Sequence, residues 1–206
     1  MRIWGRISSI NVRKVVLAAQ WLQLPFERID AGGAFGIVKT PEYVARNPNS
    51  LVPLLEEPDG YTLYESNVIV RYLAARHSPG GLYPLDVRER FDAERWMDWQ
   101  QTTLNPAGRD AFVQLVRMPE GERSAAKVDA SITATEPLLA LLDAQLARRP
   151  FLAGERFTIA DIPIACELHR WWGLPLAQPP RPHLQRWYDG IRALPAARGV
   201  LDIALS

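Results

Sequence analysis

Three polar residues near the N-terminus could act on a sulfur atom. Ser8, Ser9 and Asn11 lie in the sequence SSIN, directly before a stretch with helical periodicity. A hydroxyl or amide group at the start of a helix can donate a hydrogen bond to a sulfur anion, and the helix dipole favours the charged form. The turn contains no cysteine, so we expect the sulfur to arrive with a ligand.

The expected energies are sufficient for such a role of Ser9 and Asn11. Lowering a thiol pKa by ~2 from its reference value of about 8.5 requires about 2.7 kcal/mol. One charge-assisted hydrogen bond of about 1.5–3 kcal/mol, together with roughly 0.3–1 kcal/mol from the dipole, supplies this amount. Ordinary helix capping is the alternative explanation for these residues, and the segment alone does not decide between the two.

A second group of candidate ligand-binding residues lies within residues 47–74. Pro53 interrupts an apolar strand, where it removes a ladder hydrogen bond and indicates a sheet edge. The edge near Val52 could pair with an extended peptide. Glu65 could hold a ligand ammonium group, and the helix start at Ser66 could bind a carboxylate. A small peptide-like zwitterion would satisfy all three, whereas an edge-strand proline and an N-cap serine are the purely structural alternative.

The elements that position these residues follow from periodicity and turn residues. Residues 2–7 alternate as a strand, and a helix with Val15 and Ala18 on its buried face follows and ends at Pro25. FERIDA, LVPLLE and YTLY predict three further strands, and a helical pattern begins at Val68. The order βαβ followed by ββα predicts a thioredoxin-like domain with a mixed sheet. In that fold the first turn faces the ligand, and without Cys-x-x-Cys there it cannot perform dithiol chemistry itself.

The rest of the chain is predicted to be helical, which makes the fold class α+β. Prolines and glycines in residues 78–86 interrupt the helical pattern, so we predict a linker there, between a domain at 1–77 and an all-helical domain at 87–206. In FTIADI, Thr158 and Asp161 have the spacing of a capping box in its acidic variant, which predicts a helix start.

Composition limits the possible partners. The chain has 206 residues, is 48% hydrophobic and carries a formal net charge of +1, so neither nucleic acid nor an anionic membrane is an expected partner. The N-terminus lacks a signal sequence and Cys166 is the only cysteine, so we expect a soluble, cytoplasmic protein. We expect no metal, because His77, His169 and His183 have no ligand spacing. Cys166, inside an apolar helix, is predicted to be a core residue.

The segments SSINVRKV, NPNSLVPLL, YESNVIVRYLA and FTIADI together resemble the cytosolic glutathione transferases, and the resemblance covers essentially the whole chain. It implies a homodimer in which glutathione binds the N-terminal domain and its thiolate attacks a small hydrophobic electrophile held by the C-terminal domain. The resemblance makes Ser9 or Asn11 the thiol-activating residue, without deciding which. The glutathione-binding residues that it implies are Lys39, Val52, Pro53 as a cis-proline, Glu65 and Ser66.

Two features are less well determined by this resemblance. Many relatives have glutamine before the Val-Pro pair, where this chain has Leu51, so one contact to the glycyl end of glutathione is in doubt. Lys39 is otherwise an ordinary solvated loop lysine. The electrophile pocket needs apolar walls, for which we predict a set of residues that also suits plain packing. These residues are Ile10, Phe35, Phe112, Trp171 and Trp172.

The sequence leaves two further functions open. A glutathione-dependent disulfide or peroxide reductase or a dehalogenase would use the same glutathione site with a different second substrate. A non-catalytic binding or dimerisation module would have lost activity, and the substitution at Leu51 slightly favours that reading.

Overall fold

The computed structural model describes residues 1–206 and confirms the predicted α+β architecture. A four-stranded sheet forms the first part of the chain, in the order β2-β1-β3-β4. β1 pairs parallel to β2 and antiparallel to β3, which pairs antiparallel to β4. The strands are β1 (Arg2–Trp4), β2 (Glu27–Ile29), β3 (Leu54–Glu56) and β4 (Thr62–Tyr64).

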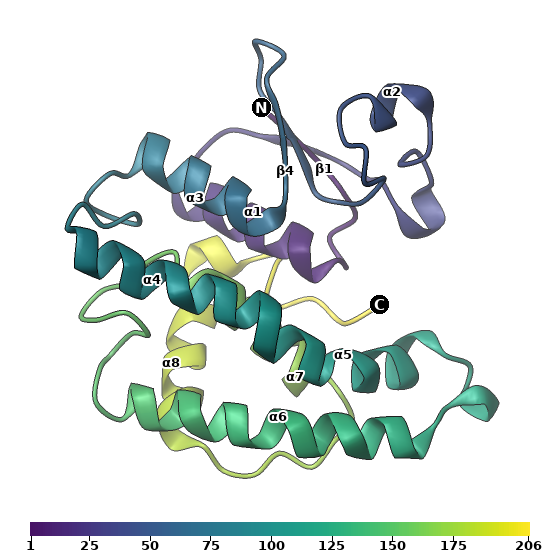
Figure 1. Ribbon diagram of the computed structural model, residues 1–206, viewed down its shortest axis with the longest axis vertical. Coiled ribbons are helices and arrows are strands. Elements are labelled where there is room, and N and C mark those ends of the chain that lie inside the picture. Colours follow the sequence, from purple (N-terminus) through teal and green to yellow (C-terminus); the bar gives the residue numbers. More distant parts are fainter.

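Two helices cover one face of this sheet. α1 (Ile10–Trp21) connects the parallel strands β1 and β2, which need a crossover of this kind, and it packs against α3 (Ser66–His77). Figure 1 shows α1 and α3 between the strands and the C-terminal helices. The short helix α2 (Pro41–Val44) lies beside the strands, at the end of the molecule away from the C-terminal helices. Because α1 also packs against α7, the whole run Val12–Ala19 is buried, including two basic side chains.

The second part of the chain is helical, as predicted. Residues 78–86 join α3 to α4 without a helix or strand, and the Asp86 carboxylate accepts hydrogen bonds from the N–H groups of Arg88 and Glu89 at the start of α4. Two π-helical segments, η2 and η3, extend α4 and α5. The elements are α4 (Val87–Trp99), η2 (Gln100–Leu104), α5 (Asn105–Phe112), η3 (Val113–Arg117), α6 (Ala125–Leu146), α7 (Asp161–Trp172) and α8 (Pro182–Arg192), with short 3-10 turns at Gly33–Phe35, Glu120–Glu122 and Pro195–Ala197.

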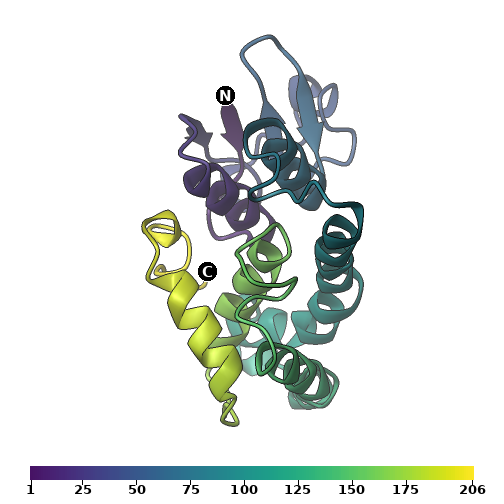
Figure 2. The ribbon, with the colours of Figure 1, turned by 90° about the vertical axis from the view of Figure 1, so that its left-hand side faces the viewer.

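The buried helix α7 lies at the centre of the C-terminal part. Figure 2 shows α7 between α8 and α4, and it also contacts α1. Cys166 lies in the core of this helix, as predicted, and burial raises the pKa of its thiol to about 12. No helix has both the length and the hydropathy that crossing a membrane requires.

The FTIADI segment starts α7 in a way that differs slightly from the prediction. Thr158 is not the N-cap, because α7 begins at Asp161 and residues 159 and 160 form a turn. The Asp161 carboxylate nevertheless accepts the Thr158 N–H bond of a capping box, at 2.9 Å. It also accepts hydrogen bonds from the N–H of Leu152 and the indole N–H of Trp187, so this fully buried side chain joins α7 to α8.

Candidate functional site

The first turn leaves its serine hydroxyl free. Ser9 is the N-cap residue of α1 with extended backbone dihedral angles, but its side chain makes no capping hydrogen bond. The turn is closed by the backbone, where the Ser9 N–H donates to the Arg6 carbonyl at 3.1 Å and the Ser9 carbonyl accepts from Arg13 at 3.0 Å. The Ser9 side chain therefore does not cap α1, and it lines a cavity at the start of that helix.

Asn11 joins the two parts of the site that the sequence identifies separately. The Ser66 hydroxyl donates a hydrogen bond to the Asn11 side-chain oxygen at 3.2 Å, across 55 residues of sequence. This bond occupies the amide oxygen, so the amide N–H groups of Asn11 are its remaining donors. A hydrogen-bond donor for a sulfur anion thus lies directly beside the start of α3.

The Val52–Pro53 peptide bond is cis, as the resemblance implies for Pro53. Tyr43 and Asn47 hold the preceding residue, because their hydroxyl and amide groups donate to the Leu51 carbonyl at 2.7 and 2.8 Å. Burial raises the pKa of Tyr43 to about 12, so its hydroxyl remains a donor at neutral pH. No backbone hydrogen bond outside the helices and strands engages Val52, which leaves its N–H and carbonyl able to pair with a bound peptide.

Glu65 has an uncommon backbone conformation at the junction of β4 and α3. Its φ is +73°, a region that costs energy for a residue with a side chain and is often found at ligand sites. The Glu65 side chain is exposed and makes no capping bond, whereas Ser66 is 5% exposed as the first residue of α3. The local geometry therefore presents a free carboxylate next to an anchored hydroxyl.

These residues line one cavity of about 140 Å³. It brings together Asn11, Val52, Pro53, Glu65 and Ser66, while the exposed Lys39 does not line it. The other lining residues are Asn47, Asn49, Leu51, Tyr64 and Gln101.

Gln101 is a cavity residue that the sequence analysis missed. It comes from the π-helical η2 of the C-terminal part, and its side-chain oxygen accepts a hydrogen bond from the Lys14 ammonium at 3.0 Å. Lys14 is fully buried, and burial lowers its pKa to about 8. No local pattern identifies Gln101, but a lysine followed by two valines in α1 is a signal that could have directed attention to Lys14.

A second cavity, of about 210 Å³, lies on the other side of the first turn. Ile10 and Phe112 line it with Ser9, so these predicted pocket residues do come together. The remaining lining residues include five arginines, which the prediction of an apolar pocket does not contain. They are Arg6, Arg13, Arg109, Arg117 and Arg170.

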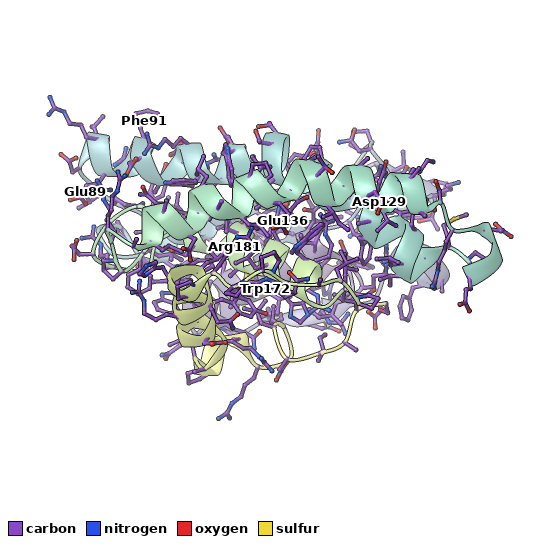
Figure 3. The ribbon with its side chains drawn as sticks, turned by 90° about the horizontal axis from the view of Figure 1, so that it is seen from below. Glu89, Phe91, Asp129, Glu136, Trp172 and Arg181 are labelled. Atoms are coloured by element: carbon purple, nitrogen blue, oxygen red, sulfur yellow. The ribbon has the colours of Figure 1, made fainter.

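The structure does not bring Phe35, Trp171 or Trp172 to this cavity. Phe35 is 53% exposed in the loop after β2, and Trp171 is buried in the core. Trp172 packs edge-on against Tyr188, with ring centroids 4.9 Å apart, and lines a different hollow near Arg181 (Figure 3). Both tryptophan side chains serve helix packing. They point in different directions because successive residues of α7 lie on different sides of a buried helix.

His169 lies on the wall of the 210 Å³ cavity, and its imidazole ring is uncharged. Its ring nitrogens contact the Tyr188 hydroxyl at 3.2 Å and the Ile203 carbonyl at 2.9 Å. Burial, and then the positive charge of Arg13, lower its pKa to about 4, so the ring is neutral at pH 7. No group of three or more His, Cys, Asp or Glu side chains is arranged to hold a metal ion.

Two family models match the chain, the glutathione S-transferase N-terminal domain over residues 8–76 and the C-terminal domain over residues 103–195. The chain is 44% identical over 205 residues to glutathione S-transferase GstB of Escherichia coli (strain K12), covering 99% of each. It is 31% identical over 183 residues, 86% of its length, to elongation factor 1-gamma 1 of Oryza sativa subsp. japonica, of which it spans 43%.

The fold also matches a solved enzyme over its full length. The theta class glutathione S-transferase of Xanthomonas axonopodis pv. citri, solved with glutathione bound, has a TM-score of 0.95 and 44% identity, covering 100% of this chain and 98% of that one. The chain therefore belongs to the glutathione S-transferase family.

Proposed function

We propose that this glutathione S-transferase holds glutathione in the 140 Å³ cavity, stabilises its thiolate with Ser9 and Asn11, and adds it to a small electrophile in the adjacent 210 Å³ cavity. The observation that carries the proposal is the hydrogen bond from Ser66 to Asn11. It orients the Asn11 amide so that its N–H groups are available as donors in the 140 Å³ cavity, while Ser9, two residues earlier, lines the 210 Å³ cavity.

The groups along the cavity match those of the tripeptide. The free N–H and carbonyl of Val52 would pair with the cysteinyl backbone. Glu65 would hold the γ-glutamyl ammonium group, and the start of α3 at Ser66 would bind the γ-glutamyl carboxylate. Gln101 would add a donor to that end, because Lys14 occupies its amide oxygen. Lys39 would bind the glycyl carboxylate if its exposed loop closes over the ligand.

The nucleophile of the chemical step is the sulfur of glutathione, so the protein does not need to supply one. The glutathione thiol releases its proton to solvent, and donors at Ser9 and Asn11 lower its pKa by favouring the anion. The thiolate then attacks the electrophilic carbon, a C–S bond forms, and a leaving group such as chloride departs with the bonding electron pair. Cys166 takes no part, because its raised pKa keeps the thiol protonated at neutral pH.

Purified protein provides the direct test. We expect it to bind glutathione, to lower the thiol pKa of the bound ligand and to accelerate its addition to an aryl chloride above the uncatalysed rate. Ser9→Ala and Asn11→Ala report which residue is the donor, and Thr133→Ala, which removes an exposed hydroxyl on α6, is the matched control. Unchanged thiol titration in both variants would refute the assigned roles. Much faster turnover of a disulfide than of the aryl chloride would instead favour a reductase.

A non-catalytic module is the second candidate, because the chain is also similar to elongation factor 1-gamma 1, whose name does not describe a transferase. In that case the domain would bind a ligand or a second copy of the chain without catalysing a reaction. Measurable glutathione binding without any rate acceleration would support this reading, whereas turnover that Asn11→Ala reduces would exclude it.

We also propose that two copies of the chain associate through α3 and α4. Val68, Val87 and Phe91 are 43, 59 and 62% exposed there, and apolar side chains exposed in a group commonly mark interfaces. Figure 3 shows Phe91 projecting away from the helices below it. In sedimentation equilibrium, Phe91→Glu should shift the protein toward monomer. Leu141→Glu, an equally apolar exposed site on α6, should not.

A further inference from the structure

The wall of the 210 Å³ cavity has an unusual charge. Five arginines line it, and none of the lining residues is Asp or Glu. The complete chain has 24 basic and 23 acidic residues, so this local excess is not a consequence of composition. A cavity lined by one sign of charge concentrates ligands of the opposite sign.

Two of these arginines are already engaged by the protein. Arg170 pairs with Glu167 and donates to the Asn105 side chain at 2.9 Å. Arg13 is 2% exposed and donates to the carbonyls of Val200 and Ala204. Their charge is fixed in the wall, and they have little remaining freedom to bind a ligand.

The other three arginines retain binding capacity. The guanidinium groups of Arg6 and Arg109 make no hydrogen bond or ion pair within the protein, and that of Arg117 makes one hydrogen bond, to the Ser206 backbone oxygen at 2.7 Å. Arg6 comes from the first turn, whereas Arg109 and Arg117 come from α5 and η3. The free donors therefore reach the cavity from both halves of the molecule.

Arg6 and Arg117 act on each other as like charges. The pKa of Arg117 lies below its usual value, first because of burial and then because of the positive charge of Arg6. Both side chains pack against neighbouring residues. The Arg6 guanidinium lies close to Gly32, since a Cβ added there would be 2.9 Å from it, and the Arg117 guanidinium lies 5.1 Å from the centre of the Phe112 ring. Two supported guanidinium groups without a counter-charge form a natural site for one anion.

We propose that the electrophile accepted by this enzyme is a small molecule with a carboxylate or a similar anionic group, bound between Arg6 and Arg117 while its reacting carbon faces Ser9. This inference rests on the proposed function and specifies its second substrate. Ile10, Phe112 and Val113 would cover the uncharged part of the molecule. The step is the one described above: the C–S bond forms, the C–Cl bond breaks, and chloride leaves with its electron pair.

A pair of electrophiles of nearly equal shape tests the charge directly. 4-Chloro-3,5-dinitrobenzoate carries an anionic carboxylate where 4-chloro-3,5-dinitrobenzamide carries a neutral amide. To remove their difference in intrinsic reactivity, kcat/KM for each compound is divided by the rate constant of its uncatalysed reaction with glutathione. We expect this normalised value to be at least ~10-fold higher for the benzoate, because a charge-assisted hydrogen bond contributes about 1.5–3 kcal/mol. Equal values, or a preference for the amide, would overturn the proposal.

Variants assign the effect to the cavity. Arg117→Gln should reduce the benzoate-to-amide ratio by ~10-fold, whereas Arg148→Gln, which removes an exposed arginine without partners, should leave both rates unchanged. A ratio that survives Arg117→Gln would refute the assignment. If Arg6→Gln raises the KM for glutathione equally with both electrophiles, Arg6 serves glutathione and the proposed anion site is wrong.

Failure of this inference differs from failure of the proposed function. Efficient turnover of the amide without a charge preference refutes only the anionic substrate. Absence of turnover with both refutes the proposed conjugation and this inference with it. Binding of the two glutathione conjugates, measured by calorimetry, gives a second readout that needs no catalysis. Tighter binding of the carboxylate conjugate, weakened by Arg117→Gln, supports the anion site, and equal binding contradicts it.

Discussion

The two cavities that residues at the start of α1 line differ in how they are charged. The 140 Å³ cavity combines a carboxylate at Glu65 with neutral amides and backbone groups, which suits a zwitterionic peptide. The 210 Å³ cavity contains five arginines and no carboxylate, which suits an anion. The first turn supplies Asn11 to one cavity and Ser9 to the other, so one short segment lies between two different electrostatic environments.

The difference has a consequence for selectivity. Glu65 would attract the ammonium group of glutathione and repel an anionic electrophile. Glutathione also carries two carboxylates, so the arginines alone would not exclude it, and Glu65 would be the group that distinguishes the two substrates. The following predictions test the two cavities separately.

The largest effect on catalysis is expected from the substitution of Asn11. Asn11→Ala should raise the pKa of the bound glutathione thiol by about 1–2 and reduce kcat/KM at pH 7 by roughly 10–100-fold, because one hydrogen bond to the anion is lost. The thiolate absorbance of the binary complex, titrated with pH, measures the shift. The loss should be equal for neutral and anionic electrophiles, and an unequal loss would place Asn11 in the second cavity.

A stability effect is expected at His169 in the arginine-lined cavity. The pKa of this ring is about 6.5 when unfolded and about 4 when folded, so the folded state binds fewer protons between these values and stability falls as the pH falls through this window. The full shift corresponds to ~3.4 kcal/mol, and since the ring is partly exposed we expect about 2 kcal/mol.

Urea unfolding of the parent and of His169→Gln from pH 7 to pH 4 measures this term. The parent should lose about 2 kcal/mol more than the variant. The pKa of Asp161, raised by burial to about 6, acts with the opposite sign, but it contributes to both proteins and cancels in the difference. Parallel pH profiles would show that burial and the charge of Arg13 do not keep His169 neutral.

A moderate effect is expected on the zwitterion side. Glu65→Gln removes the proposed partner of the ligand ammonium group, and the KM for glutathione should rise by about 10-fold while the benzoate-to-amide ratio stays unchanged. Glu155→Gln, at an exposed carboxylate without partners, is the matched control. A changed ratio in Glu65→Gln would mean that the two cavities are electrostatically coupled.

The smallest effect is expected at Lys14. Lys14→Met removes the hydrogen bond that orients Gln101, so the KM for glutathione should rise by about 5-fold, the value of one hydrogen bond near 1 kcal/mol. The midpoint of thermal unfolding should not fall, because a buried charge is removed at the same time. Lys127→Met, at an exposed lysine, controls for loss of charge, and an unchanged KM in Lys14→Met would remove Gln101 from the site.

Several residues that line the 140 Å³ cavity could be predicted from the sequence because the signals for them are local. Pro53, which lies directly before β3 and not inside the strand as predicted, the Glu65-Ser66 pair at the start of α3, and Asn11 in the first turn of α1 each have a recognisable neighbourhood. For the 210 Å³ cavity the sequence was less informative: Ile10 and Phe112 line it, but Phe35 and Trp172 do not. Aromatic side chains on helices serve packing as often as binding, so their presence alone carries little information.

The chain without its fold was enough to establish the α+β class, the strand and helix order and several residues that line the 140 Å³ cavity, because periodicity, turns and caps act over a few residues. The tertiary structure alone decided that Ser66 meets Asn11, that Gln101 reaches across from η2, and that Arg6 and Arg117 line one cavity. These residues are separated by tens of positions or more. The packing of α3 against α1 brings Ser66 to Asn11, and the packing of the helical part against the first part of the chain brings the other residues together. The charge of the second cavity is therefore a property of the assembled domains and of no single segment.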